Sequence, residues 1–248
     1  MNLNSMYAPD RLLIFGHRGA QAYAPMNTLP AFERAVEQKA DGIELDVHLS
    51  KDRHPVVIHD FTVDATTDGS GNVDVMTLAE LQALDAGAWF DAEFAGTRIP
   101  ALQQVFEAMP PDLAINIEIK AATDGIEQVV YDCIRQFNRV EQVIVSSFNP
   151  MILQNFRKLT PDVAIGFLYH PDLPQEFTQL MMNLPHEARH PHHRVIDAIY
   201  VEQAKSRGYR INAWTVNDPE RAVELRNLGV DGIITDTPDV IRRALGSV

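Results

Sequence analysis

Three acidic residues in two short stretches have the types and spacing that metal chemistry requires. Glu44 and Asp46 alternate with apolar residues in 41–49, which places both carboxylates on one face of a β-strand. Glu118 lies in a second stretch with the same alternation, 114–119. Neighbouring carboxylates repel one another unless a cation lies between them, and Mg²⁺ and Ca²⁺ prefer oxygen ligands. We therefore predict a divalent metal site at these three residues.

Two histidines and two cations accompany the acidic residues. His17 and Arg18 stand between glycines, which allow a ligand to approach closely, and His59 ends a further apolar run. Histidine acts as a general acid or base near neutral pH, whereas Arg18 and Lys120 supply fixed positive charge. A metal, two imidazoles and two cations suit phosphoryl transfer, because phosphate oxygens need neutralising and the leaving oxygen needs a proton.

Structural roles could also explain these residues. Glu44 and Asp46 alone fit a solvated strand edge, and His17 alone fits a structural histidine. Lys120 could pair with Glu118, but residues two apart on a strand lie about 6–7 Å from each other, so we expect them to share a ligand instead. The convergence of all these groups favours the functional interpretation.

The elements that position these residues alternate between strand and helix. Expected strands are 12–15, 43–49, 55–59, 114–119, 143–147, 163–169, 187–190, 210–216 and 232–235. Expected helices are 29–39, 77–84, 101–109, 125–137, 150–159, 173–183, 196–207, 219–227 and 238–245. The gap between the second and third strands is too short for a helical crossover, so we predict a β-hairpin that returns His59 to the carboxylates.

Eight strands remain once the returning hairpin arm is set aside. Such alternation predicts an α/β fold, a (β/α)8 TIM barrel forming a single domain over 1–248, with 60–100 as a small insertion or cap. In that barrel the C-terminal strand ends would form the site. A doubly wound open sheet is the alternative, but no Gly-x-Gly-x-x-Gly turn follows a strand.

Composition limits the partners and the compartment. The net charge of −13 makes nucleic acid and anionic membrane surfaces poor partners. No apolar run approaches the roughly 20 residues of a membrane span, and residues 1–10 lack the pattern of a signal peptide. Cys133 is the single cysteine, which fits a reducing compartment, so we expect a cytoplasmic protein. The sequence leaves the oligomeric state open.

Eight ordered segments resemble the glycerophosphodiester phosphodiesterase family, and they span nearly the whole chain. They are Phe15–Gly19, Pro25–Thr28, Gly42–Val47, Val56–Asp60, Ile117–Lys120, Ser146–Phe148, Ala213–Asn217 and Asp231–Asp236. The resemblance implies a TIM-type barrel that uses a divalent metal to hydrolyse glycerophosphodiesters to sn-glycerol 3-phosphate and an alcohol.

The resemblance also implies a role for each site residue. Glu44, Asp46 and Glu118 would bind the metal, Mg²⁺ or Ca²⁺. His17 and His59 would form the acid/base pair, one taking a proton from the glycerol 2-hydroxyl or from water. The remaining assignments are Arg18 and Lys120 for the phosphate, and Trp214 and Phe148 for the substrate, although core packing explains Trp214 nearly as well and Phe148 better.

One departure from the family pattern leaves alternatives open. The family turn reads Pro-Glu-Asn-Thr, whereas Met26 takes the place of the glutamate here. Asp60 or Asp236 could replace the missing carboxylate, or the chain could be a catalytically impaired phosphate-ester binding homologue. A lysophospholipase D-like activity is a second alternative, with Trp89, Phe90 and Phe94 of the cap receiving an acyl chain.

A histidine-rich run at 185–193 also invites a metal interpretation. No spacing of partner ligands supports that interpretation, so we predict a polar segment that leads from a strand into a loop.

Overall fold

Parallel strands joined by helices form the body of the molecule. The computed structural model describes residues 6–7 and 11–246. Its strands are β1 (Leu13–Gly16), β2 (Gly42–Leu49), β3 (Pro55–Val57), β4 (Ala114–Ile119), β5 (Val143–Ser147), β6 (Ala164–Tyr169), β7 (Ala188–Pro191), β8 (Arg210–Ala213) and β9 (Gly232–Thr235). The order is β1-β9-β8-β7-β6-β5-β4-β2-β3, and pairing of β1 with β2 closes the ring. The prediction of an eight-stranded parallel barrel with one added hairpin strand is confirmed.

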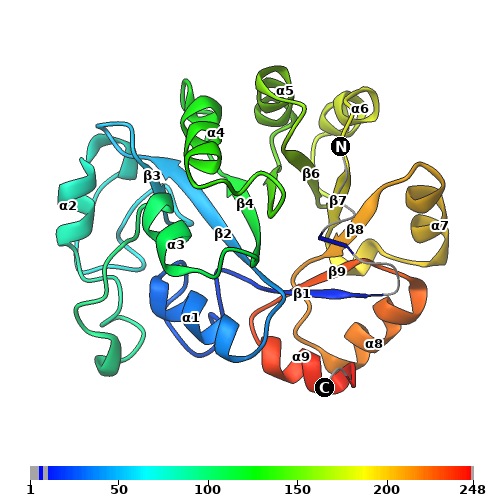
Figure 1. The fold of residues 1–248 in the computed structure, drawn as a ribbon, viewed down its shortest axis with the longest axis horizontal. Coiled ribbons are helices and arrows are strands. Elements are labelled where there is room, and N and C mark those ends of the chain that lie inside the picture. The colour runs from blue at the N-terminus through cyan, green and yellow to red at the C-terminus, as the bar shows by residue number, and fades with distance from the viewer. Residues whose placement is uncertain (1–5, 8–10, 247–248) are drawn as a thin grey trace.

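The helices surround the barrel, as Figure 1 shows. They are α1 (Leu29–Glu37), α2 (Leu78–Ala83), α3 (Leu102–Ala108), α4 (Ile126–Gln136), α5 (Pro150–Leu159), α6 (Gln175–Asn183), α7 (Ala198–Ser206), α8 (Pro219–Leu228) and α9 (Pro238–Ala244). Short 3-10 helices are η2 (Val73–Val75), η3 (Ala92–Phe94) and η4 (His193–Val195). The predicted helices agree with these bounds within a few residues.

Alternation along each strand separates the core from the barrel interior. Ile43, Leu45 and Val47 of β2 have no exposed surface and pack in the cluster that also contains helix residues Phe32 and Phe156. This burial of apolar side chains against the outer helices stabilises the barrel. The intervening residues of β2 therefore face the interior, which is why charged side chains enter it.

The hairpin forms as predicted and ends beside the acidic residues. β2 and β3 are antiparallel, with Val47 opposite Val57 and Leu49 opposite Pro55. The backbone N–H of Ile58 donates to the carbonyl of Asp46 at 3.1 Å, although β3 itself ends two residues before His59. The chain thus carries His59 back to the carboxylates by strand pairing.

The segment that follows the hairpin has a small core of its own. A buried apolar cluster joins its residues Val63, Val73, Leu81, Ala86 and Ile99 to Val56 and Ile58 at the end of the hairpin. Helix α2 of this segment lies beyond β3 at one side of the barrel (Figure 1). Thr77 and Glu80 begin that helix with a reciprocal capping box. This segment corresponds to the predicted insertion over 60–100.

One strand is clearly shorter than expected. The predicted strand 210–216 ends at Ala213, after which Trp214 keeps a single parallel bridge to His192 and the Val216 N–H donates to the Ile234 carbonyl. None of the described helices is long and apolar enough to cross a membrane. The expectation about residues 1–10 falls mainly on 1–5 and 8–10, which lie outside the described residues.

Candidate active site

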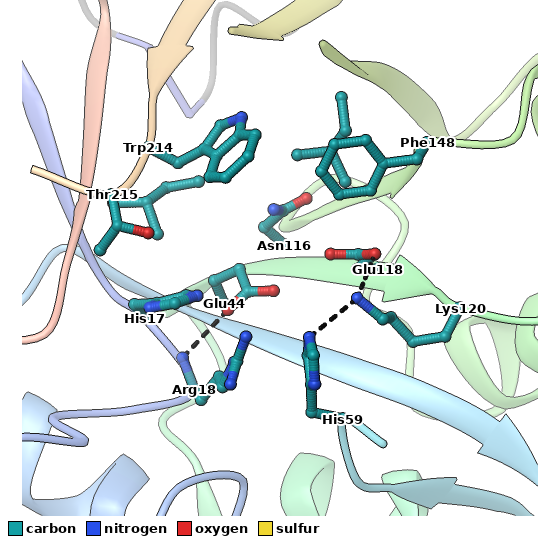
Figure 2. A pocket seen from close by; sticks show the side chains of 12 residues that line it. His17, Arg18, Glu44, His59, Asn116, Glu118, Lys120, Phe148, Trp214 and Thr215 are labelled. Carbon is teal, nitrogen blue, oxygen red and sulfur yellow. Dashed lines mark hydrogen bonds and ion pairs between the residues drawn. The ribbon is translucent and has the colours of Figure 1, made fainter. Parts of the chain in front are cut away.

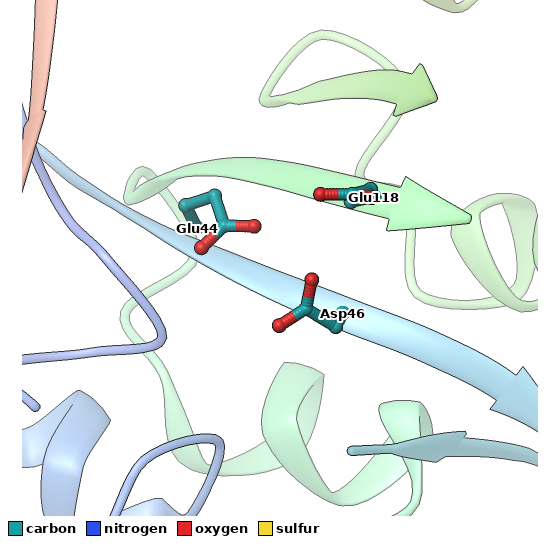
Figure 3. Close-up of side chains that lie close together, drawn as sticks. All are labelled: Glu44, Asp46 and Glu118. Atoms are coloured by element: carbon teal, nitrogen blue, oxygen red, sulfur yellow. The ribbon is translucent and has the colours of Figure 1, made fainter. Parts of the chain in front are cut away.

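Three carboxylates from β2 and β4 meet inside the barrel, as Figure 3 shows. Strand register explains their meeting, because Asp46 lies opposite Glu118 and Glu44 lies opposite Asn116. One oxygen from each of Glu44, Asp46 and Glu118 lies within 4.8 Å of the other two. All three side chains are buried. The residues predicted as metal ligands therefore form one cluster.

Burial and mutual repulsion change the proton affinity of this cluster. Burial, followed by the charges of Asp46 and Glu118, raises the pKa of Glu44 well above its ordinary value. Burial and the Asp46 charge raise the pKa of Glu118 to about 7. Burial also acts to raise the pKa of Asp46, but the charges of Lys120 and Arg18 outweigh it and lower that pKa. Two of the three carboxyl groups thus hold protons tightly unless a cation replaces them.

Two cations flank the carboxylates. Lys120 Nζ lies 2.7 Å from Glu118 Oε1 and 3.6 Å from Asp46 Oδ1, and Arg18 Nε lies 3.3 Å from Asp46 Oδ2. The less favoured alternative, a pair of Lys120 with Glu118, is therefore present, and a shared ligand stays a prediction. Backbone spacing disfavoured this pair, but both side chains are long enough to meet above the strand although their Cα atoms are apart.

His17 directly follows the C-terminal end of β1 and has a carboxylate partner. Its Nδ1 is 2.7 Å from Asp236 Oδ1, which leaves Nε2 unpaired by that contact. Gln21 and Asn217 donate further hydrogen bonds to Asp236, the latter at 2.5 Å. Burial acts to raise the pKa of Asp236, but the hydrogen bond from His17 and the other two donors outweigh it and lower that pKa. Asp236 therefore stays ionised and fixes the His17 ring.

His59 repeats this arrangement in a more exposed setting. Its Nδ1 lies 2.6 Å from Asp60 Oδ1, and its Nε2 lies 3.1 Å from Lys120 Nζ. The Asp60 side chain is 44% exposed against 23% for Asp236. Burial lowers the pKa of His59, and the nearby charges of Lys120 and Arg18 add to that effect although Asp46 opposes it. His59 is thus a neutral imidazole near pH 7.

Unusual backbone conformations hold the first loop against the carboxylates. Arg18 and Asn27 have backbone φ angles of 52° and 59°, values that residues other than glycine rarely adopt. The Asn27 amide donates to Asp46 Oδ2 at 2.8 Å and accepts from the Asp46 backbone N–H at 3.2 Å. Glu44 Oε2 accepts from the Arg18 backbone N–H at 3.0 Å. The loop and β2 therefore position each other.

The cavity between these groups has a volume of about 300 Å³. Its lining residues are His17, Arg18, Glu44, His59, Asn116, Glu118, Lys120, Phe148, Leu168, Trp214, Thr215 and Ile234. Figure 2 shows Trp214 and Phe148 across the cavity from Arg18 and His59. Both aromatic residues predicted for the substrate thus face the cavity, which core packing alone would not require.

Met26 itself contacts Arg18. Its sulfur accepts from Arg18 Nη1 at 3.3 Å. Asp60 and Asp236, the two acids considered as replacements for a glutamate, instead contact the imidazoles of His59 and His17. The sequence did not reveal this, because Asp236 is 219 residues from its partner and only barrel closure brings them together.

The cap aromatics do not extend the cavity. Phe90 packs edge-on against Trp89 and Phe94, with ring centroids 5.7 Å and 5.6 Å apart, and none of the three lines the cavity. Trp89 Nε1 donates to the Ala86 carbonyl at 2.9 Å. An acyl chain bound at these three rings would therefore lie outside this cavity.

The histidine-rich run crosses from a strand into a loop. His186 stacks on Tyr209 with centroids 4.3 Å apart, and His190 is fully buried inside the barrel on β7. His192 and His193 follow the strand and begin η4. Within the described residues, these histidines do not converge on a common point with acidic or cysteine ligands.

Comparison with known proteins gives a consistent result. Residues 17–240 match the model of the glycerophosphoryl diester phosphodiesterase family. A glycerophosphodiester phosphodiesterase of Caldanaerobacter subterraneus is 43% identical over 93% of this chain and 96% of its own, and one of Bacillus altitudinis is 36% identical over 91% and 95%. A phosphodiesterase structure from Oleispira antarctica, in complex with the product sn-glycerol-3-phosphate, has a TM-score of 0.87, 30% identity and 99% coverage of both chains.

Proposed function

Because the chain belongs to the glycerophosphoryl diester phosphodiesterase family, we propose that it hydrolyses glycerophosphodiesters to sn-glycerol 3-phosphate and an alcohol. The observation that carries this proposal is the arrangement around one cavity of three carboxylates, two cations and two imidazoles with carboxylate partners. Each group matches a need of phosphate-ester hydrolysis, namely charge neutralisation, phosphate contact and proton transfer.

The donor set fits a hard divalent cation, Mg²⁺ or Ca²⁺. Glu44, Asp46 and Glu118 offer only oxygen, and the neighbouring Asn116 has a buried amide oxygen with no hydrogen-bond partner among the described residues. Two raised carboxyl pKa values indicate excess negative charge that a cation would relieve. When bound, such an ion neutralises charge on the phosphate oxygens and polarises the ester.

Proton transfer falls to His17 and His59. Each ring has a carboxylate at Nδ1, so Nε2 is the atom that exchanges a proton with the substrate, and in His59 this atom also contacts Lys120 Nζ. One imidazole accepts the proton of the attacking oxygen, either the glycerol 2-hydroxyl or water, and the other protonates the alcohol oxygen that leaves phosphorus. Attack by the 2-hydroxyl would pass through a cyclic phosphate that water then opens.

Arg18 and Lys120 bind the phosphate in this scheme. Each already balances the charge of Asp46, and both line the cavity next to the imidazoles. Their positive charges stabilise negative charge that accumulates on the phosphate oxygens during attack. Trp214 and Phe148 lie across the cavity and bind the uncharged parts of the substrate.

We also propose that 1–248 acts as one catalytic domain, with 60–100 as an insertion. The single cysteine and the charge of −13 fit a cytoplasmic enzyme that acts on small soluble substrates rather than on nucleic acid or within a membrane.

Release of sn-glycerol 3-phosphate from glycerophosphocholine and glycerophosphoethanolamine tests the proposal. The assay compares protein treated with EDTA with the same protein after addition of Mg²⁺ or Ca²⁺. We expect turnover that requires a divalent cation, with Met26 tolerated. Absence of turnover with either cation would refute hydrolysis and favour a phosphate-ester binding protein. In that case Met26→Glu is the next variant to assay. Restored turnover would show that the missing glutamate causes the loss, whereas continued absence of turnover would show that the protein lacks all catalytic competence.

A further inference from the structure

Four rings stand side by side at the ends of consecutive strands on one half of the cavity mouth. We name Phe148, His170, His192 and Trp214 the ring wall. Trp214 packs edge-on against Phe148 at 5.4 Å and against His192 at 5.1 Å, measured between ring centroids. His170 lies 5.4 Å from His192 and 6.3 Å from Trp214. The four rings thus form one connected series, from Phe148 through Trp214 to His192 and His170.

Strand register places the imidazoles of His170 and His192 two residues beyond inward-facing positions of β6 and β7. His170 comes two residues after Leu168, which lines the cavity, and Leu168 pairs with His190. His192 comes two residues after His190 and forms a parallel bridge with Trp214. Side chains two apart on a strand point to the same face, so both imidazoles continue the inner face at the rim.

Backbone and side-chain hydrogen bonds hold the wall rigid. Trp214 Nε1 donates to the His190 carbonyl at 2.6 Å, and its backbone carbonyl accepts from His193 at 2.8 Å. His192 Nδ1 accepts from the Arg194 backbone N–H at 3.3 Å, so the neutral ring carries its proton on Nε2. His170 Nδ1 contacts both the backbone N–H and the carboxylate of Asp172. In both rings Nε2 has no partner among the described residues.

The charge around the wall disfavours a cationic ligand. Lys120 Nζ lies 5.9 Å from the centre of the Phe148 ring, so the Lys120 ammonium already makes the cation–π contact that a cationic ligand would make with this ring. The carboxylate nearest the wall, Asp172, is 88% exposed and pairs with His170. Burial, with His170 and Arg194 as further causes, lowers the pKa of His192, so this imidazole is a neutral hydrogen-bonding group near pH 7.

A polyol matches these features better than an ammonium group does. Its C–H faces pack against Trp214, and its hydroxyls both donate and accept hydrogen bonds, so they suit either tautomer of the imidazoles. A cavity of about 300 Å³ is at the small end for ligand sites, so a substrate with glycerol phosphate inside places its alcohol at the mouth. We propose that the ring wall binds the alcohol half of the substrate and selects an uncharged polyol, such as glycerol or inositol, over choline or ethanolamine.

This inference rests on the proposed hydrolysis, and the test separates the two. The measurement is kcat/KM for glycerophosphoglycerol, glycerophosphoinositol and glycerophosphocholine in the metal-loaded enzyme. We expect the polyol esters to be favoured by at least about tenfold, because two neutral hydrogen bonds contribute on that order. Equal or better hydrolysis of glycerophosphocholine would overturn the inference while leaving hydrolysis intact, whereas no turnover of any ester would overturn both.

Phenylalanine variants isolate the hydrogen bonds from the ring packing. His170→Phe and His192→Phe keep a ring in the wall but remove Nε2, so each should lower the polyol-to-choline ratio of kcat/KM by roughly threefold to tenfold. His54→Phe is the matched control, since His54 is an exposed histidine outside the cavity lining. An unchanged ratio in both wall variants, with melting temperatures close to that of the wild type, would also overturn the inference.

Discussion

The two halves of the cavity mouth differ in how they are built. The half from β1 to β4 carries ions, with Glu44, Asp46, Glu118, Arg18 and Lys120 in mutual contact. The half from β5 to β8 carries the four rings of the ring wall. The difference teaches that one barrel separates the chemistry of the phosphate from the recognition of the variable alcohol. Variants in each half should therefore change different kinetic quantities.

The largest expected effect is the loss of proton transfer in the charged half. We expect His17→Ala and His59→Ala each to lower kcat by about 10²–10⁴-fold, because each removes an acid or base from the reaction. Their melting temperatures should stay near that of the wild type, since both rings face the cavity. His54→Ala, an exposed histidine with a carboxylate neighbour, is the matched control. Near-normal kcat in either cavity variant would exclude that histidine from proton transfer.

The second prediction compares the two carboxylates that orient the imidazoles. Asp236→Asn should lower kcat/KM by about 10–100-fold and change its pH profile, because the amide no longer fixes the proton on His17 Nδ1. Asp60→Asn should cost less, since Asp60 is more exposed and water can take its place. A larger loss for Asp60→Asn, or an unchanged pH profile for Asp236→Asn, would contradict the positioning role of Asp236.

Metal affinity should depend on pH because the carboxylates release protons when a cation binds. With a Glu118 pKa of about 7, and that of Glu44 also raised, the apparent dissociation constant for Mg²⁺ should tighten by up to about tenfold per pH unit between pH 6 and 7. Isothermal titration at several pH values measures this. Glu118→Gln should weaken both the Mg²⁺ affinity and its pH dependence. A pH-independent affinity of the wild type would contradict the proposed link between proton release and metal binding.

Protonation of the same carboxyl groups makes the stability of the metal-free protein depend on pH. The Glu118 pKa is raised from 4.5 to about 7 on folding, so its stabilising contribution is fully present below pH 4.5 and is lost as pH rises through 7. The melting temperature in EDTA should therefore fall between pH 5 and 8. The lowered Asp46 pKa acts in the opposite sense, but only below its ordinary value of 3.8. Added metal should raise the melting temperature most at pH 8.

The charged half was largely predictable from the sequence, and the reason is physical. A buried parallel strand normally reads as continuous apolar residues, so Glu44, Asp46 and Glu118 at alternate positions violate the rule and indicate function. Strand-helix alternation likewise predicted the barrel, and the short 50–54 connection predicted the hairpin. Both signals are local, so they need no knowledge of distant contacts.

The ring half was not predictable in the same way. His170 follows β6, and His192 lies in the histidine-rich run for which the sequence predicts only a polar segment, so only the register of β6, β7 and β8 brings them to Trp214. The partnership of Asp236 with His17 and of Asn27 with Asp46 escaped prediction for the same reason. Aromatic and amide side chains are also common in cores and turns, so their types alone carry little information about function.

The last prediction tests whether the two halves are separable in stability. A Cβ on Gly166 would lie 2.6 Å from His190 Nε2, inside a layer of the barrel directly below the ring wall. His190 is fully buried, and its Nε2 lies 3.0 Å from the Asn212 amide, so the ring has little freedom to move. We expect Gly166→Ala to cost about 1–3 kcal/mol, which at about 2–4 °C per kcal/mol lowers the melting temperature by several degrees.

A double-mutant cycle with His190→Ala identifies the cause of that loss. If the clash with the imidazole is responsible, Gly166→Ala should cost much less in the His190→Ala background, because the ring that it meets is gone. Calorimetry of the four proteins measures the coupling, while titration with Mg²⁺ measures the charged half. Equal costs in both backgrounds would reject the clash. If Gly166→Ala lowered the Mg²⁺ affinity as well as the melting temperature, the two halves would be coupled, because Gly166 has no side chain that contacts the three carboxylates.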